Sequence, residues 1–317
     1  MKLGEIYKLF VKEGIASDLR SKNAIQEHLK KQRKYFNSLN KEERNDFDLE
    51  NLGNPYADTR ILYGEPEREI ETILIGIDID VPEILLADRL SSGGKKIDLV
   101  ISHHPRGVAL AGFYDVMGMQ ADMLAKLGMD IEIARGFLGE RMQEVERNVS
   151  ASNHNRPVDA ARMLDIAFMC AHTVADNHVN KYLNEYIQRR KPQTLKDLVK
   201  VLRQIPEYRL AAKDKAGPKI IIGKPEDKVG KVSLEMTGGT EGSKEIFGRL
   251  SQLGVNTIVG MHLSEEHFKR VKPEHINVVI AGHISSDTIG LNLFLDKLEK
   301  KDKFEILSCS GFRRLTR

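Results

Sequence analysis

The chain has no tryptophan, only two cysteines and no long uninterrupted apolar run. A helix that crosses a membrane needs about 20 consecutive apolar residues, and the longest runs here are much shorter. The N-terminal residues also lack the apolar core of a signal peptide. Cys170 and Cys309 have neither the spacing of a metal site nor that of a disulfide framework. These absences predict a cytoplasmic globular protein with no membrane partner.

A large excess of charge of one sign is also missing, because 49 basic and 46 acidic residues leave a net charge of +3. The ends are more basic than the middle: residues 1–46 carry 11 basic and 7 acidic residues, and residues 297–317 carry 7 and 3. Basic ends can bind nucleic acid, but a solvated helix face gives the same count. No aromatic residues interleave with these basic ones to stack on bases, which makes nucleic acid the weaker interpretation.

Apolar runs alternate with helical patterns over most of the chain. Residues 1–60 form an expected N-terminal helical extension. Residues 61–205 contain a strand, helix, strand unit, which implies parallel pairing, and form an expected first α/β lobe. Residues 206–317 alternate again and form an expected second lobe, with strands at 219–223, 232–236, 257–261, 276–281 and 304–307. The predicted fold class is a two-lobed α/β protein with mixed or parallel sheets and a metal site between the lobes.

Three predicted strands end in histidine, and two of these ends carry an aspartate four residues further on. They are His103 and His104 after 99–102, His172 with Asp176 after 167–171, and His283 with Asp287 after 278–282. Ligands of α/β sheets bind outside the carboxyl ends of the strands. The four-residue spacing places both side chains on one face of the first helical turn. One histidine alone is more often structural, but the set together predicts a common cavity.

The set offers nitrogen and oxygen donors without thiolate, which suits Zn, Fe, Mn, Co or Ni. Five or six ligands exceed what one tetrahedral ion needs, so we expect two divalent ions, bridged by Asp176. Such a pair activates water and stabilises the attacking and leaving oxygens, which favours hydrolysis of a phosphate ester, an amide or a ring C–N bond. His172 is then a candidate catalytic residue that orients Asp176 or relays protons.

Two further features bear on the substrate. Gly238, Gly239 and Thr240 follow a strand and precede a helical pattern, so they form either a phosphate-binding cradle or a tight structural turn. His262 also follows a strand and either lines the same cleft or is an ordinary core or surface histidine. The functional interpretation of the glycine-rich turn is a small phosphorylated ligand, and that of His262 is a place in the same cleft.

The segments 100–105, 171–176 and 281–287 resemble, in the same order, the three signatures of the NIF-three-like dinuclear metal centre family, also labelled type-two GTP cyclohydrolase I homologs. The resemblance covers residues 70–317. It implies a two-metal site between two α/β lobes and a ring-shaped homohexamer. The ligands that it implies are His103, His104, Asp176, His283 and Asp287. The last position is normally Glu, and Asp287 is one methylene shorter.

These observations lead to a metal-binding protein. The first hypothesis is a dinuclear metal-dependent hydrolase for a small phosphorylated or nucleotide-like substrate, with GTP cyclohydrolase-type ring opening as one case. The alternative is a non-enzymatic, metal-stabilised oligomeric ring that binds a partner protein or nucleic acid. A third hypothesis is metal trafficking or storage.

Overall fold

Two sheets organise the chain in the computed structural model, which describes residues 1–317. The first sheet has the order β1-β4-β3-β2-β9, and only its edge strand β1 is antiparallel. The second has the order β5-β8-β7-β6, and only its edge strand β5 is antiparallel. The strands are β1 (Thr59–Tyr63), β2 (Thr72–Gly76), β3 (Leu99–Ser102), β4 (Ala167–Ala171), β5 (Lys219–Ile222), β6 (Lys231–Glu235), β7 (Val255–Gly260), β8 (Asn277–Ile280) and β9 (Glu305–Cys309). The predicted fold class is confirmed.

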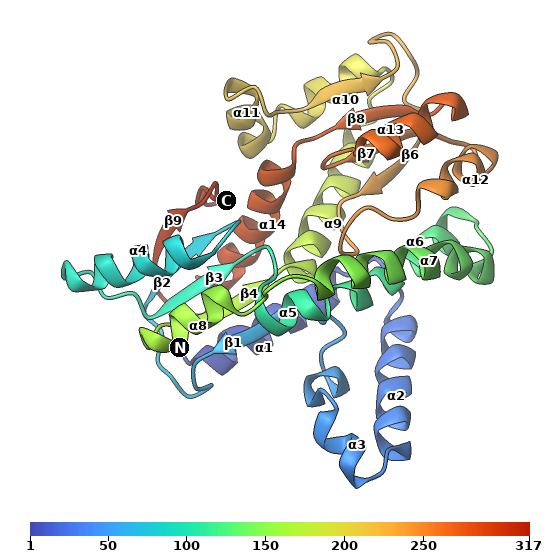
Figure 1. Cartoon of the computed structure of the whole chain (residues 1–317). Helices are drawn as coiled ribbons and strands as arrows, with labels where there is room; N and C mark the ends of the chain where they lie inside the picture. The colour runs from blue at the N-terminus through green and yellow to red at the C-terminus, as the bar shows by residue number, and fades with distance from the viewer.

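Fourteen α-helices cover and connect these sheets (Figure 1). They are α1 (Leu3–Ser17), α2 (Lys22–Ser38), α3 (Lys41–Asp46), α4 (Val81–Ser92), α5 (Gly107–Ala111), α6 (Met119–Leu127), α7 (Ile131–Ser150), α8 (Arg156–Met163), α9 (Thr173–Arg190), α10 (Leu195–Leu202), α11 (Pro206–Lys213), α12 (Phe247–Gln252), α13 (Glu265–Val271) and α14 (His283–Leu298). None of them is both long and apolar enough to span a membrane.

Helices α9 and α14 join the two halves of the molecule (Figure 1). Helix α9 follows β4 of the first sheet, and α14 follows β8 of the second. Val174 on α9 and Phe294 on α14 are buried in the core of the first sheet. Val179 on α9 and Ile289 on α14 are buried in a core that includes strands of the second sheet. Each helix therefore stabilises both cores, which fixes the sheets relative to each other.

Both chain ends pack against the first sheet. Strand β9, expected in the second lobe, pairs in parallel with β2 because α14 crosses back from the second sheet. In the N-terminal extension, Leu3, Ile6 and Phe10 of α1 are fully buried in the core of the first sheet. Helices α2 and α3 instead form a hairpin that projects from the body, and only Ile25 of α2 is buried (Figure 1). The boundaries at residues 60 and 205 stay a prediction, but the last strand lies in the first sheet.

The closest approach of α9 and α14 depends on Gly290. A Cβ atom at this position would lie 2.3 Å from the carbonyl oxygen of Ala175. We expect Gly290→Ala to push the helices apart and to lower the free energy of unfolding by about 1–3 kcal/mol, as overpacking generally does. Chemical denaturation measures this loss.

Gly136→Ala is the matched control. Gly136 is exposed on α7, and a Cβ there would meet nothing within 4 Å. Alanine is the better helix former, so this variant should gain roughly 0.5–1 kcal/mol of stability. Equal stability of the two variants would show that the helices do not meet as closely as described.

Candidate metal centre

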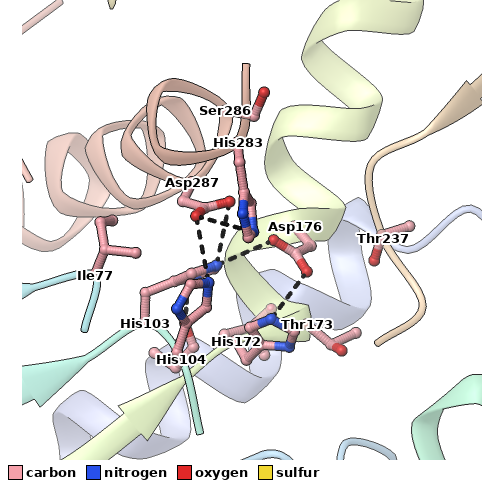
Figure 2. A network of polar contacts seen from close by, with 12 residues as sticks. Ile77, His103, His104, His172, Thr173, Asp176, Thr237, His283, Ser286 and Asp287 are labelled. Carbon is pink, nitrogen blue, oxygen red and sulfur yellow. Dashed lines mark hydrogen bonds and ion pairs between the residues drawn. The ribbon is translucent and has the colours of Figure 1, made fainter. Parts of the chain in front are cut away.

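The six predicted histidines and aspartates converge at one point between the sheets (Figure 2). They are His103 and His104 at the end of β3, His172 and Asp176 at the start of α9, and His283 and Asp287 at the start of α14. Gly282 has a φ of 113°, a conformation that favours glycine, and turns the chain from β8 into His283. The strand ends and the four-residue spacing therefore bring the side chains together as the sequence predicts.

The carboxylates lie between the imidazoles. His103 Nε2 is 3.4 Å from Asp176 Oδ1 and 3.5 Å from Asp287 Oδ1. On its other side, Asp287 Oδ2 is 3.5 Å from His104 Nε2 and 3.6 Å from His283 Nε2. His172 Nε2 is 3.7 Å from Asp176 Oδ2. Asp287 thus reaches three imidazoles although it is shorter than the Glu of the family pattern.

Three of the imidazole rings have a hydrogen-bond partner at Nδ1, the ring nitrogen that points away from the cluster. His103 Nδ1 lies 3.2 Å from the carbonyl oxygen of Ala171 and donates to it. His104 Nδ1 lies 2.7 Å from Asp78 Oδ1, and His172 Nδ1 lies 2.8 Å from Asp58 Oδ2. Partners of this kind orient the ring and direct Nε2 toward the ligand, as they do behind metal-binding histidines. The Nε2 atoms of all three rings therefore face the centre of the cluster.

Four of the inward atoms are buried and lack hydrogen-bond partners. His103 and Asp287 are fully buried, and Asp176 is 3% exposed. His103 Nε2, Asp176 Oδ1 and both oxygens of Asp287 form no hydrogen bond. Buried polar atoms are nearly always paired, because leaving one unpaired costs roughly 1–3 kcal/mol. A cation among these atoms would satisfy them together, so the donor set fits a metal ion.

Charge inside the cluster shifts the imidazole pKa values in different directions. Burial disfavours protonation of His103, but the Asp287 and Asp176 carboxylates outweigh it and raise its pKa to about 10. Burial also opposes protonation of His104, whose pKa is nevertheless raised by Asp287 and Asp78. Burial lowers the pKa of His283. Without a metal ion, therefore, a proton on His103 balances part of the carboxylate charge.

Three groups of these side chains have ligand atoms within 4.8 Å of one another and can hold a metal ion. They are His103, His104 and His172; His104, His283 and Asp287; and His103, Asp176 and Asp287. Asp287 belongs to two of the groups, whereas Asp176 belongs to one. The groups share members, so ions held by two of them would lie close together.

A cavity of about 330 Å³ adjoins the cluster and is lined by His172, Asp176 and His283. Gly239, Thr240 and His262 also line it, but Gly238 does not. The carbonyl oxygens of Gly238 and Thr240 accept hydrogen bonds from Gln120, which supports the structural interpretation of this turn. The α-helix that follows, α12, has only six residues and is preceded by a 3-10 turn, so it offers little of a helix dipole. A phosphate contact there stays a prediction.

His262 lines this cavity beside His283. Its ring centroid is 4.9 Å from that of His283, and its Nδ1 is 3.3 Å from Glu241 Oε1. The backbone N–H of Ser264 donates to the same oxygen at 2.7 Å. Burial disfavours the charged form of Glu241, but His262 and Ser264 outweigh it and lower its pKa to about 2. Glu241 is therefore ionised and orients His262.

Sequence reasoning missed the partners that hold the imidazoles. Asp58 lies in a segment rich in turn-forming residues, yet it is fully buried and binds His172 across 114 positions of the chain. Asp78 follows β2 and binds His104. The position of Asp78 after a strand was a usable signal, because β2 and β3 are neighbours with their carboxyl ends at the same edge.

No family model matches the sequence. No curated protein matches it either. Solved structures do match. A NIF3 superfamily protein from Sphaerobacter thermophilus is 25% identical, with a TM-score of 0.70 over 80% of this chain and 91% of that one. Reduced HcgD from Methanocaldococcus jannaschii is 17% identical, with a TM-score of 0.51 over 84% of this chain and 94% of that one. The resemblance of this chain to the NIF-three-like family is therefore confirmed.

Proposed function

We propose that the protein is a dinuclear metal-dependent hydrolase that acts on a small phosphorylated or nucleotide-like substrate. The observation that carries this proposal is the convergence of six imidazole and carboxylate side chains, four of whose inward atoms are buried without a hydrogen-bond partner. A single structural zinc ion would need only four ligands, whereas six side chains face this point. Hydrolytic sites with two ions use such an excess of oxygen and nitrogen donors.

In this proposal Asp287 is the shared ligand. Its Oδ2 faces His104 and His283, which would hold one ion. Its Oδ1 faces His103, which with Asp176 would hold the other. The arrangement favours Asp287 as the bridge over Asp176, the bridge expected from the sequence. Zn, Fe, Mn, Co and Ni all accept this donor set.

Two such ions would activate a water and stabilise charge on the attacking and leaving oxygens. The protein's own contribution is a proton carrier beside them. His172 keeps its proton on Nδ1 through Asp58, which leaves Nε2 free to accept one. His172 also lines the cavity, so its Nε2 lies where a substrate would meet the cluster. GTP ring opening is one reaction within this class, and the ring-shaped hexamer stays a prediction.

The metal proposal predicts that Asp287→Ala removes both ions. Because losing an outer partner of a ligand already costs roughly 10–100-fold in affinity, losing a shared ligand should cost more than about 100-fold. Elemental analysis and titration with Co²⁺ measure the effect. Asp159→Ala, an exposed aspartate on α8, is the matched control and should keep its metal content. Equal metal content in the two variants would exclude this site.

Metal affinity should also rise with pH. The pKa of His103 is about 10 without metal, so an ion must displace its proton at neutral pH. The apparent affinity should therefore increase about tenfold per pH unit between pH 6 and 9 for each proton displaced. Titration in buffers of different ionisation enthalpy counts the protons released. An affinity that stays constant over this range would contradict the charge balance described above.

Hydrolysis is tested with the metal-loaded protein on phosphate monoesters, phosphate diesters and nucleoside triphosphates, including GTP. Asp176→Ala should abolish turnover. Asp58→Asn should keep the metals but lower kcat by roughly tenfold or more and shift its pH profile, because the tautomer of His172 is no longer fixed. Equal turnover in the wild type and Asp176→Ala would count decisively against a hydrolase.

A further inference from the structure

The cavity beside the metal cluster is lined by polar and apolar side chains. One row of polar side chains follows α9, where His172, Asp176, Asn180 and Asn184 recur at intervals of four residues and all line the cavity. This spacing places the four side chains in one row along the helix. The first two belong to the metal cluster, so the row leads from the cluster into the cavity.

Asn180 is the unusual member of this row. It is fully buried, and neither its amide nitrogen nor its amide oxygen has a hydrogen-bond partner. The other buried asparagine of this helix, Asn177, is satisfied: it donates to Gly14 and Tyr56 and accepts from Thr237. Buried amides are normally paired, because each unpaired group is costly. The state of Asn180 therefore indicates that a ligand supplies its partners.

The chemistry of Asn180 limits that ligand. A carboxamide presents one acceptor and two donors side by side. Its best partner is a group that presents a donor and an acceptor in the same way, which is the edge of a lactam or of another carboxamide. The primary amide of a flexible chain would serve less well, since ordering it costs entropy. A lactam within a planar ring is already rigid.

The remaining walls favour a planar ring over a phosphate. Met123, Met236, Met261 and Phe247 supply adaptable and aromatic apolar surface. Glu241 supplies negative charge, and the one lysine of the lining, Lys126, donates to the carbonyl oxygen of Leu19, so the walls favour an anion little. Burial and the neighbouring Glu241 raise the pKa of Glu235 to about 7, against the opposing effect of His262. Glu235 can thus accept from ring N–H groups when ionised and donate when protonated. The volume of about 330 Å³ is at the lower end of small-molecule sites.

We propose that this cavity binds a planar nitrogen heterocycle with a lactam edge, paired with the side chain of Asn180, as the part of the substrate remote from its charged end. The inference rests on the proposed function, because it places the phosphorylated or otherwise charged end at the metal cluster. The substrate class is therefore a phosphorylated compound that carries a lactam-edged ring. Asn180 is the residue that selects this ring.

Two probes that differ only at this edge test the proposal. Hypoxanthine carries a lactam, whereas purine has the same bicyclic ring without the oxo group. We expect hypoxanthine to bind the metal-loaded, full-length protein at least about tenfold more tightly than purine, because purine offers only an acceptor, N1, at this edge and leaves the amide oxygen of Asn180 without a donor. Calorimetry or ligand-observed NMR measures both affinities. Equal affinities, or no binding of hypoxanthine, would overturn the inference.

Substitutions of Asn180 test whether hypoxanthine binds at this residue. Asn180→Leu has a similar volume and should lose the preference for hypoxanthine, and Asn180→Asp should lose it too because a donor is replaced by an acceptor. Asn148→Leu makes the same change at an exposed position of α7 and should behave as wild type. An unchanged preference in folded Asn180→Leu would overturn the inference. If that variant fails to fold, the comparison of the two probes on the wild type still decides.

The experiment separates this inference from the proposed function. Asp287→Ala should lose the metals but keep the preference for hypoxanthine, since the cavity contacts do not include Asp287. The two probes could instead bind equally while the metals bind and hydrolysis proceeds. That result would support the proposed function and contradict the lactam site. If the preference vanishes together with the metals, hypoxanthine is bound by the ions rather than by Asn180, which also overturns the inference.

Discussion

The contact between α9 and α14 is the constraint on which the site depends. Each helix starts at the end of a central strand in a different sheet, and each carries an aspartate near its start. The absence of a side chain at Gly290 lets the backbone of α14 approach the carbonyl of Ala175, next to Asp176. This approach also accounts for the reach of Asp287, which lies less than one turn before Gly290 and contacts three imidazoles despite its short side chain. The close packing of the two helices therefore brings the short side chain of Asp287 near the imidazoles.

The elements of the two sheets were predictable because their signal is local. An apolar run that ends in histidine or glycine marks both a strand and its carboxyl end, and β3, β4 and β8 lie within one residue of the ranges expected for them. The pairing of β9 with β2 was not predictable in this way, because nothing in residues 305–309 specifies a partner more than 200 positions earlier. The same holds for α1, whose apolar face predicts burial but not the sheet that covers it. The periodicity of apolar residues predicts that a helix or strand forms, whereas long-range packing determines which elements lie next to it.

Within the site, too, some residues were predictable from the sequence and others were not. The six inward side chains were predictable, since their residue types and positions at strand ends both point to metal binding. The groups behind them were not, because a buried carboxylate such as Asp58 has the same sequence context as an ordinary turn residue. Asn180 gave no signal at all, since an asparagine at a helical position is common. It differs from Asn177 only in having no partner once both are buried, and burial is a property of the whole fold.

The charge of the cluster explains why its atoms remain unpaired with each other. Asp176 and Asp287 bring two carboxylates to a place with no lysine or arginine among the facing side chains, so only protons or cations can balance them. One proton on His103 balances one charge, but its Nε2 lies 3.4 Å from Asp176 Oδ1 and 3.5 Å from Asp287 Oδ1, which is longer than a strong charge-assisted hydrogen bond. Contraction of the site would shorten these distances, but the three imidazoles are held from behind and the two helices already meet at Gly290. The fold thus keeps the donors at a spacing that protons satisfy poorly and at which a cation among them would satisfy them together.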